Sequence, residues 1–153
     1  MDFMTALDIG ASGMSADRTQ LNVTAMNLAN AKTTRMPGGN GPYVRKTVIK
    51  TTSDLDDRFG VHMRTALDRE VKGVRVMGIA LDNRPTRRVY EPGHPDADDD
   101  GFVEYPDINV VEEMANMMTA QRNYEANATT VDTVKAMYLK ALEIRSEERR
   151  VGK

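Results

Sequence analysis

The sequence predicts an α+β protein in which two long terminal α-helices pack as a coiled-coil-like unit, with a small β-rich module between them. Apolar residues recur every three or four positions at both ends of the chain, whereas β-branched residues, Gly and Pro gather in the middle. Only 5% of the 153 residues are aromatic, against 11 Met, which suits slim helix–helix contacts. We therefore divide the chain into an N-terminal helix of a core domain (1–35), a β-rich outer module (36–106), a C-terminal helix of the core domain (107–144) and a tail (145–153).

The first helix is predicted over residues 2–30. Gly10 and Gly13 permit either close approach of another backbone or local flexibility, and the sequence does not choose between them. Asn27 and Asn30 are expected to close the helix and to fix the turn into the outer module. The helix is too long for a small domain to cover, so part of its apolar stripe is expected to meet another helix. This stripe has heptad character and consists of Met4, Leu7, Ala11, Met14, Arg18, Leu21, Ala25 and Leu28.

The middle of the chain is predicted to contain three strands. A loop rich in Gly, Pro and Asn at 33–42 precedes the first strand at 43–51. A second strand at 71–79 alternates apolar and other residues, and a third at 87–91 ends before Pro92. Residues 53–69 fit neither the helical nor the strand pattern. The core of this module would be thin if the module stood alone.

A second long helix is predicted over residues 108–144. Asn109 is placed to cap it and Glu112 to complete a capping box, while Glu112 and Glu113 favour the positive end of the helix dipole. Because the stripes of the two helices are complementary, antiparallel or staggered pairing between them is the simplest arrangement. Both stripes have width to spare, which indicates further helices from other chains. The second stripe consists of Val110, Met114, Met117, Gln121, Tyr124, Ala128, Val131, Lys135, Tyr138 and Leu142.

The tail at 145–153 loses the apolar period abruptly. Its nine residues match the in-frame translation of a common sequencing adapter. We predict that the tail is a sequencing artefact, and we assign it no function.

Composition excludes several classes of protein. With 21 Lys+Arg against 23 Asp+Glu, the net charge of −2 argues against a nucleic-acid partner. The absence of Cys excludes disulfides and thiolate sites. A mean hydropathy of −0.53 and the lack of an apolar run of roughly 20 residues predict no direct membrane insertion. The acidic N-terminus lacks the basic region of a cleavable secretory signal.

One acidic segment has the spacing of a calcium-binding EF-hand loop, with the candidate ligands Asp96, Asp98, Asp100 and Asp107. Position 12 of that loop is Asp where Glu reaches better, and the neighbouring Pro106 disrupts the start of an exiting helix. We interpret the segment as a solvated acidic turn and predict no metal, with a calcium-binding module as the alternative function.

The sequence predicts no catalytic residues and no cofactor. His94 lies between two prolines beside the acidic segment, and His62 has no defined partner. The Gly-rich stretch near residue 40 lacks the Lys and the following helix that hold phosphate groups.

Several segments of the chain carry motifs beyond simple periodicity, beginning with residues 9–18 (IGASGMSADR). These residues resemble the N-terminal signature of the bacterial flagellar basal-body rod protein family, which hook proteins share. More specific segments, which resemble the proximal-rod members, are 89–97, 100–106, 109–114 and 122–127. Asp17 stands where relatives commonly carry Gln, and Met14 where Leu is usual; neither substitution breaks the stripe.

The resemblance implies a structural subunit of the proximal rod, which assembles through its terminal helices into the tubular drive shaft for motility. It implies that the chain leaves the cell unfolded through the flagellar type III export apparatus, without a cleaved signal, and joins the rod in the periplasm. The implied partners are other rod subunits, further copies of the chain itself, and the ring and adaptor proteins of the basal body.

We expect the assembly contacts to use apolar residues of both stripes. Isolated terminal helices bury too little surface to offset their ordering entropy, so we expect them to be mobile until assembly. A cytosolic helical adaptor remains a second alternative, and it would show stable helicity as a monomer. The expected contact residues are Leu7, Met14, Leu21, Leu28, Met114, Met117, Tyr124, Val131 and Leu142.

Overall fold

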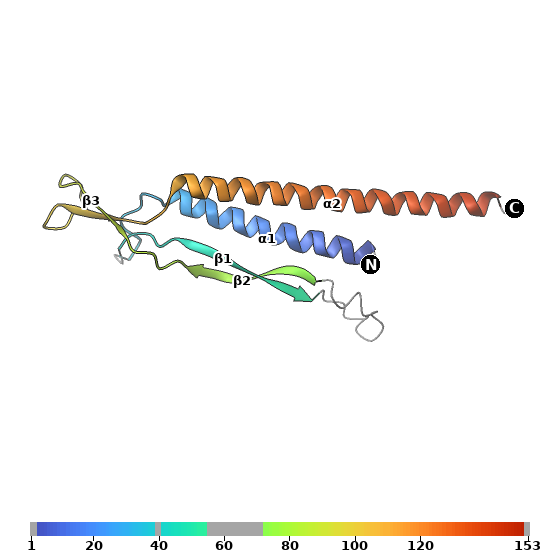
Figure 1. Cartoon of the computed structure of the whole chain (residues 1–153), viewed down its shortest axis with the longest axis horizontal. Coiled ribbons are helices and arrows are strands. Elements are labelled where there is room, and N and C mark those ends of the chain that lie inside the picture. The colour runs from blue at the N-terminus through green and yellow to red at the C-terminus, as the bar shows by residue number, and fades with distance from the viewer. Residues whose placement is uncertain (1–2, 39–40, 55–71, 152–153) are drawn as a thin grey trace. The chain divides into compact units, whose positions relative to one another are not determined.

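The computed structural model describes residues 3–38, 41–54 and 72–151, and it confirms the α+β class (Figure 1). The elements in chain order are α1 (Phe3–Ala29), β1 (Lys46–Asp54), β2 (Lys72–Leu81), β3 (Arg87–Tyr90), β4 (Phe102–Tyr105) and α2 (Val110–Val151). The helices precede and follow four strands along the chain, which form two two-stranded sheets: β1 pairs with β2, and β3 pairs with β4. No helix within these ranges has the length and apolar character needed to cross a membrane.

The contacts divide the chain into two compact units, and each long helix contributes one segment to the first unit and another segment to the second. We call Met1–Asp17, Lys50–Arg75 and Arg122–Lys153 together the first unit. Arg18–Ile49 and Val76–Gln121 together form the second unit.

In the first unit, α1 and α2 run antiparallel. The rings of Phe3 and Tyr138 pack edge to face with their centroids 5.3 Å apart. Further along α1, Gly10 faces Val131, so a later residue of α1 contacts an earlier residue of α2. The strand side of the unit is tied to α1 by the backbone N–H of Val74, which donates to Ser12 Oγ at 3.1 Å.

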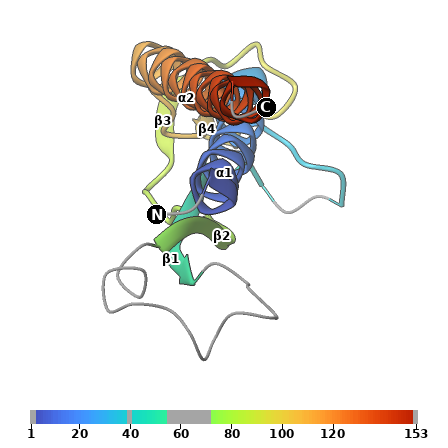
Figure 2. The same cartoon turned by 90° about the vertical axis from the view of Figure 1, so that its right-hand side faces the viewer.

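The second unit contains most of the buried side chains. Its α1 segment buries Val23 and Thr24, and its α2 segment buries Ala120. The β3–β4 hairpin pairs Tyr90 with Phe102, whose ring centroids are 5.3 Å apart. Seen along the helices, α1 lies between α2 and the β1–β2 ribbon (Figure 2).

The hairpin turn requires a glycine. Gly101 has φ +78°, a backbone conformation that L side chains rarely adopt, and a Cβ there would lie 2.9 Å from the Tyr90 ring. The turn is closed by the N–H of Asp98, which donates to the carbonyl oxygen of Phe102 at 2.8 Å.

The bounds of two predicted elements were wrong, and one strand was missed. β1 begins at Lys46 rather than at 43, because the side chains of Tyr43 and Arg45 point to polar partners on the helices. α2 passes Ile144 and ends at Val151, since the Glu and Arg of this stretch favour the helix whatever the hydrophobic pattern does. β4 was not predicted at all. The unassigned segment 53–69 lies almost wholly outside the described residues.

Candidate assembly interface

The α1 residues expected at the assembly interface are partly accessible. None of the four lies in the core of the chain. The structure leaves each of them half-buried: Leu7, Met14, Leu21 and Leu28. Part of each side chain therefore stays available to another molecule.

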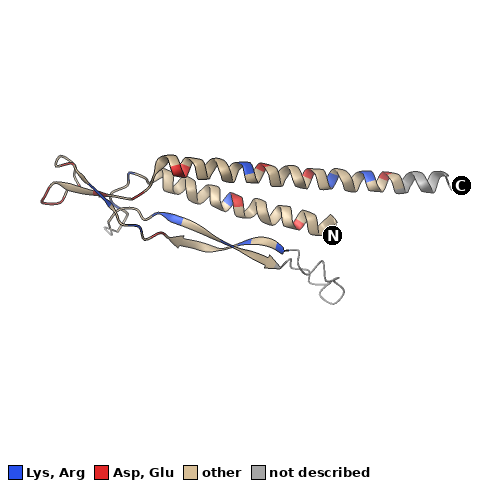
Figure 3. Cartoon of the chain, in the orientation of Figure 1, with Lys and Arg blue, Asp and Glu red and all other residues tan. Residues whose placement is uncertain are grey.

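The α2 residues of the predicted interface are more accessible. Met114, Tyr124 and Leu142 are exposed, and Met117 and Val131 are half-buried. Charged side chains are few on α1 but recur along α2 (Figure 3). Groups of exposed apolar side chains on a helix are typical of surfaces that another protein covers.

Besides the Phe3–Tyr138 ring pair, the contact between the two helices in the first unit is formed around small and polar residues of α1. A Cβ on Gly10 would lie 2.6 Å from Val131 Cγ2, and one on Gly13 would lie 2.8 Å from Asn127 Nδ2. Both glycines therefore permit close approach, which resolves the question that the sequence left open. Ala16 is also buried in this unit.

Asp17 holds α1, α2 and β1 of the first unit together. This carboxylate is only 6% exposed. It accepts a hydrogen bond from Asn127 Nδ2 at 3.1 Å on α2, and it pairs with Lys50 Nζ at 3.0 Å on β1. The polar Asp17 is therefore satisfied by partners within the first unit.

A larger polar network crosses the second unit. Glu113, on α2, is 1% exposed, and its Oε1 accepts from Arg45 Nη2 at 2.6 Å and from Nε at 2.9 Å. Arg45 Nη1 also donates to Asp82 Oδ2 at 2.9 Å. Burial by itself lowers the pKa of the Arg45 guanidinium, but the hydrogen bonds and charges of Glu113 and Asp82 raise that pKa above its usual value.

Asn27 connects this network to the strands. Its Nδ2 donates to the carbonyl oxygen of Lys46 at 2.8 Å and to Glu113 Oε2 at 3.1 Å. Its Oδ1 accepts from the N–H of Lys46 at 2.9 Å and from the Tyr43 hydroxyl at 3.0 Å. Burial, and then the charge of Glu113, raise the pKa of the Tyr43 phenol above its usual value. Within the described residues, no buried side-chain polar atom lacks a partner.

The helix ends use the asparagines that the sequence singled out. Asn30 Nδ2 donates to the carbonyl oxygen of Met26 at 2.8 Å, at the last turn of α1. Asn109 Oδ1 accepts from the N–H of Val111 at 3.0 Å and from that of Glu112 at 3.4 Å, which caps α2. Glu112 is exposed, whereas the neighbouring Glu113 is the buried member of the pair.

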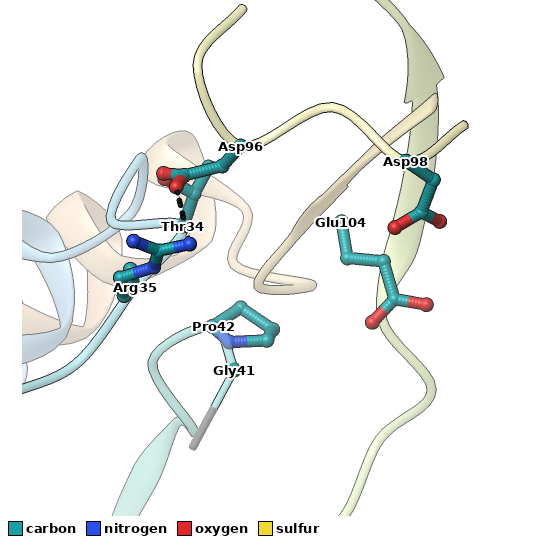
Figure 4. A pocket seen from close by; sticks show the side chains of 7 residues that line it. All are labelled: Thr34, Arg35, Gly41, Pro42, Asp96, Asp98 and Glu104. Atoms are coloured by element: carbon teal, nitrogen blue, oxygen red, sulfur yellow. Dashed lines mark hydrogen bonds and ion pairs between the residues drawn. The ribbon is translucent and has the colours of Figure 1, made fainter. Parts of the chain in front are cut away.

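The acidic turn does not form an EF-hand, because strand β4 occupies 102–105 where calcium ligands and an exiting helix would follow. Asp96 is held by Thr34 Oγ1 at 2.8 Å and Arg35 Nη2 at 3.2 Å, at the edge of a cavity of about 320 Å³ (Figure 4). Asp98 pairs with Arg88 Nη2 at 3.2 Å. Over the described part of the chain, no three His, Cys, Asp or Glu side chains converge as a metal site would require.

The remaining candidate residues from the sequence take no part in the polar network around Glu113. Asp100 and Asp107 are exposed, and His94 Nδ1 accepts from the N–H of Asp96 at 3.1 Å, which makes His94 part of the turn. His62 lies outside the described residues.

Sequence reasoning missed the central residues of the network. Glu113 was assigned to the helix dipole, and Tyr43 and Arg45 were assigned to a strand. The sequence offers little signal for these residues, because polar and charged side chains on a helix are usually solvated.

Comparison with known proteins places both ends of the chain in one family. A family model described as flagella basal body rod protein matches residues 7–35, and one for the flagellar basal body rod FlgEFG protein C-terminal region matches residues 99–144. The chain is 37% identical to the flagellar basal-body rod protein FlgC of Borreliella burgdorferi, over 94% of this chain and 98% of the relative. It is 38% identical to FlgC of Salmonella typhimurium (93% and 97%) and 34% identical to FlgC of Bacillus subtilis (91% and 95%).

Proposed function

This chain belongs to the FlgC family of flagellar basal-body rod proteins, and we propose that it is a structural subunit of the proximal rod. In this role it assembles through its terminal helices into the tubular drive shaft for motility. The helices at 1–35 and 107–144 form the rod core, and the module at 36–106 lies further out and stiffens the shaft.

One observation carries this proposal beyond the family assignment: large apolar side chains of α2 remain exposed and those of the α1 stripe stay half-buried, although the two helices are in contact. Met114, Tyr124 and Leu142 are exposed on α2. The seam between the helices uses the Phe3–Tyr138 ring pair together with Gly10 and Asp17 and their partners on α2. A chain that was complete as a monomer would bury its large apolar residues first. These residues are therefore available for neighbouring subunits.

The two units differ in how much of the chain they bury, which bears on when the helices order. The described part of the first unit buries two apolar side chains, Ala16 and Val134. The second unit also contains the buried network around Glu113. We infer that the helix segments of the first unit order on assembly, because so little buried area does not offset their conformational entropy.

The wider setting follows from the family. The subunit is exported unfolded by the flagellar type III apparatus without a cleaved signal, and it joins the rod in the periplasm. Its neighbours are further copies of itself, other rod subunits, and ring and adaptor proteins of the basal body. It performs no catalysis and needs no cofactor.

The proposal is tested by charge substitutions in the helix faces. Leu21→Asp and Leu142→Asp, each in a flagellated host that lacks its own FlgC, should abolish swimming while the protein is still secreted, because a carboxylate enters an apolar contact. Asn22→Asp is the matched control, since Asn22 is exposed beside Leu21, and it should swim normally. Full motility of both Leu variants would contradict the proposal.

A second measurement separates the rod subunit from a cytosolic adaptor. Circular dichroism of the purified chain should show less helix than the 27 and 42 residues of α1 and α2 together. An adaptor would show the full helix content as a monomer and would not be secreted.

A further inference from the structure

Four residues on the inner side of α2 recur at intervals of seven and alternate in polarity. Glu113 (1% exposed) and Ala120 (3%) belong to the second unit. Asn127, which is half-buried, and Val134 (7% exposed) belong to the first unit. We call these four residues the buried column. Along the column, each polar side chain is followed by an apolar one.

Each polar residue of the buried column has a polar partner on α1. In the second unit, Asn27 Nδ2 donates to Glu113 Oε2 at 3.1 Å. In the first unit, Asn127 Nδ2 donates to Asp17 Oδ2 at 3.1 Å. Asn27 is 1% exposed and Asp17 is 6% exposed, so both depend on protein partners rather than on bulk water. Each unit thus holds one buried polar pair between α1 and α2.

The seven-residue spacing leaves a second pairing open to the two helices. A shift of α1 along α2 by one heptad keeps the same side of α2 in the seam, because seven residues make nearly two turns. Such a shift moves α1 by about 10 Å. Helix α2 is long enough to accept it, since α2 continues from Tyr138, which packs against Phe3, to Val151. The connection from α1 to β1, at 30–45, is long enough to follow this movement.

The shifted pairing would set a polar residue against an apolar one in both units. In the first unit, Asp17 would leave Asn127 and face Val134. In the second unit, Asn27 would face Ala120. Neither new neighbour has a side chain that forms hydrogen bonds, and burying a carboxylate or an amide without a partner is costly. The apolar stripes impose no such penalty, because they repeat with the same period and match in either pairing.

We propose that Asp17 and Asn27 are positioning residues that fix the register in which α1 pairs with α2. Buried polar residues select one register in coiled coils in the same way, at some cost in stability. The inference concerns the chain itself and goes beyond its proposed role in the rod. It bears on that role because the register decides which residues of the two stripes lie side by side, and therefore which surface a neighbouring subunit meets.

The test compares two double variants of α1. Asp17→Leu with Asn27→Leu removes both polar groups, so that the shifted pairing sets apolar residues against apolar ones. Asp8→Leu with Asn22→Leu is the matched control, because it makes the same changes of residue type at exposed positions of α1. A role in stability alone would lower the free energy of unfolding without moving one helix along the other.

The distance between two spin labels reports the register. Because the chain has no Cys, Arg18→Cys and Val111→Cys, both at exposed positions of the second unit, provide the labelled thiols. Arg18 lies nine residues before Asn27, and Val111 lies two residues before Glu113. The labelled sites are therefore offset by about 16 Å along the antiparallel helices, and a shift of α1 by one heptad raises this offset to about 27 Å.

Pulsed electron paramagnetic resonance on the purified full chain should give one distance for the labelled wild type and for the Asp8/Asn22 control. The Asp17/Asn27 variant should add a population whose distance is longer by about 10 Å. The shorter distance alone in that variant would refute the proposal, and so would two distances in the wild type. If the Leu variant shows no cooperative unfolding in urea, Asp17→Ala with Asn27→Ala takes its place, since Ala is smaller and a good helix former, and the same outcomes decide.

Motility separates this inference from the rod role. If the Asp17/Asn27 variant keeps only the shorter distance while the wild-type chain restores swimming to a host without its own FlgC, the register proposal fails and the rod role stands. If the wild-type chain does not restore swimming, the proposed function fails, and the distances still decide the register.

Discussion

Removing the Arg45 guanidinium should destabilise the second unit far more than removing an exposed arginine. In Arg45→Met, Glu113 loses both of its bonds to Arg45, at 2.6 and 2.9 Å. Its carboxylate still occupies a position at which Glu113 is 1% exposed in the wild type. Only the donor of Asn27, at 3.1 Å, remains among the bonds described above. Breaking a buried ion pair by removing one partner costs about 3–5 kcal/mol.

The assay is urea unfolding of the purified full chain, followed by far-ultraviolet circular dichroism. For a urea m value of about 1–3 kcal/mol per molar, the loss lowers the unfolding midpoint by about 1 M or more. Arg84→Met is the matched control, because the Arg84 side chain is 41% exposed and its pair with Asp82 is worth about 0–1 kcal/mol.

A double variant isolates the charge. Arg45→Met with Glu113→Gln should be more stable than Arg45→Met alone, since the neutral amide leaves no unpaired charge in the core. If Arg45→Met lowers the unfolding free energy no more than Arg84→Met does, the network does not hold the helices to the strands and the reasoning is refuted.

Three other predictions concern the seam, the buried phenol and the acidic turn. Gly10→Ala should reduce swimming although Ala is the better helix former, because the new Cβ meets Val131 Cγ2 at 2.6 Å; a freely swimming variant would contradict the close packing. Because the pKa of Tyr43 is raised in the folded chain, its contribution to stability is complete below its unfolded value near 10.0 and declines as pH rises through the folded value. The thermal unfolding temperature, measured from pH 8 to pH 11.5, should therefore fall less steeply with pH for Tyr43→Phe than for the wild type. Parallel curves of unfolding temperature against pH would count against this role. Calorimetric titration of calcium into the chain should give no binding heat, whereas a stoichiometric heat would revive the metal alternative for residues 96–107.

The periodic elements of this protein could be read from its sequence, because they depend on spacing along the chain. The α1 helix was predicted at 2–30 and is found at Phe3–Ala29. The strand at 71–79 corresponds to β2 at Lys72–Leu81. β4 could not be predicted, since its four residues form a strand only by pairing with β3. In this pairing Arg87 lies opposite Tyr105, and Tyr90 lies opposite Phe102. A short strand with no long apolar pattern depends on its partner.

The sequence by itself determined which residues are apolar, helical and able to cap, and its motifs were sufficient to identify the family. Only the tertiary structure decided which residues are buried. Glu112 and Glu113 are chemically the same and adjacent, yet one is exposed and the other is 1% exposed. The difference arises because Asn27 and Arg45, distant in sequence, come to lie beside Glu113 alone. Burial depends on what packs against a residue, and local sequence does not contain that information.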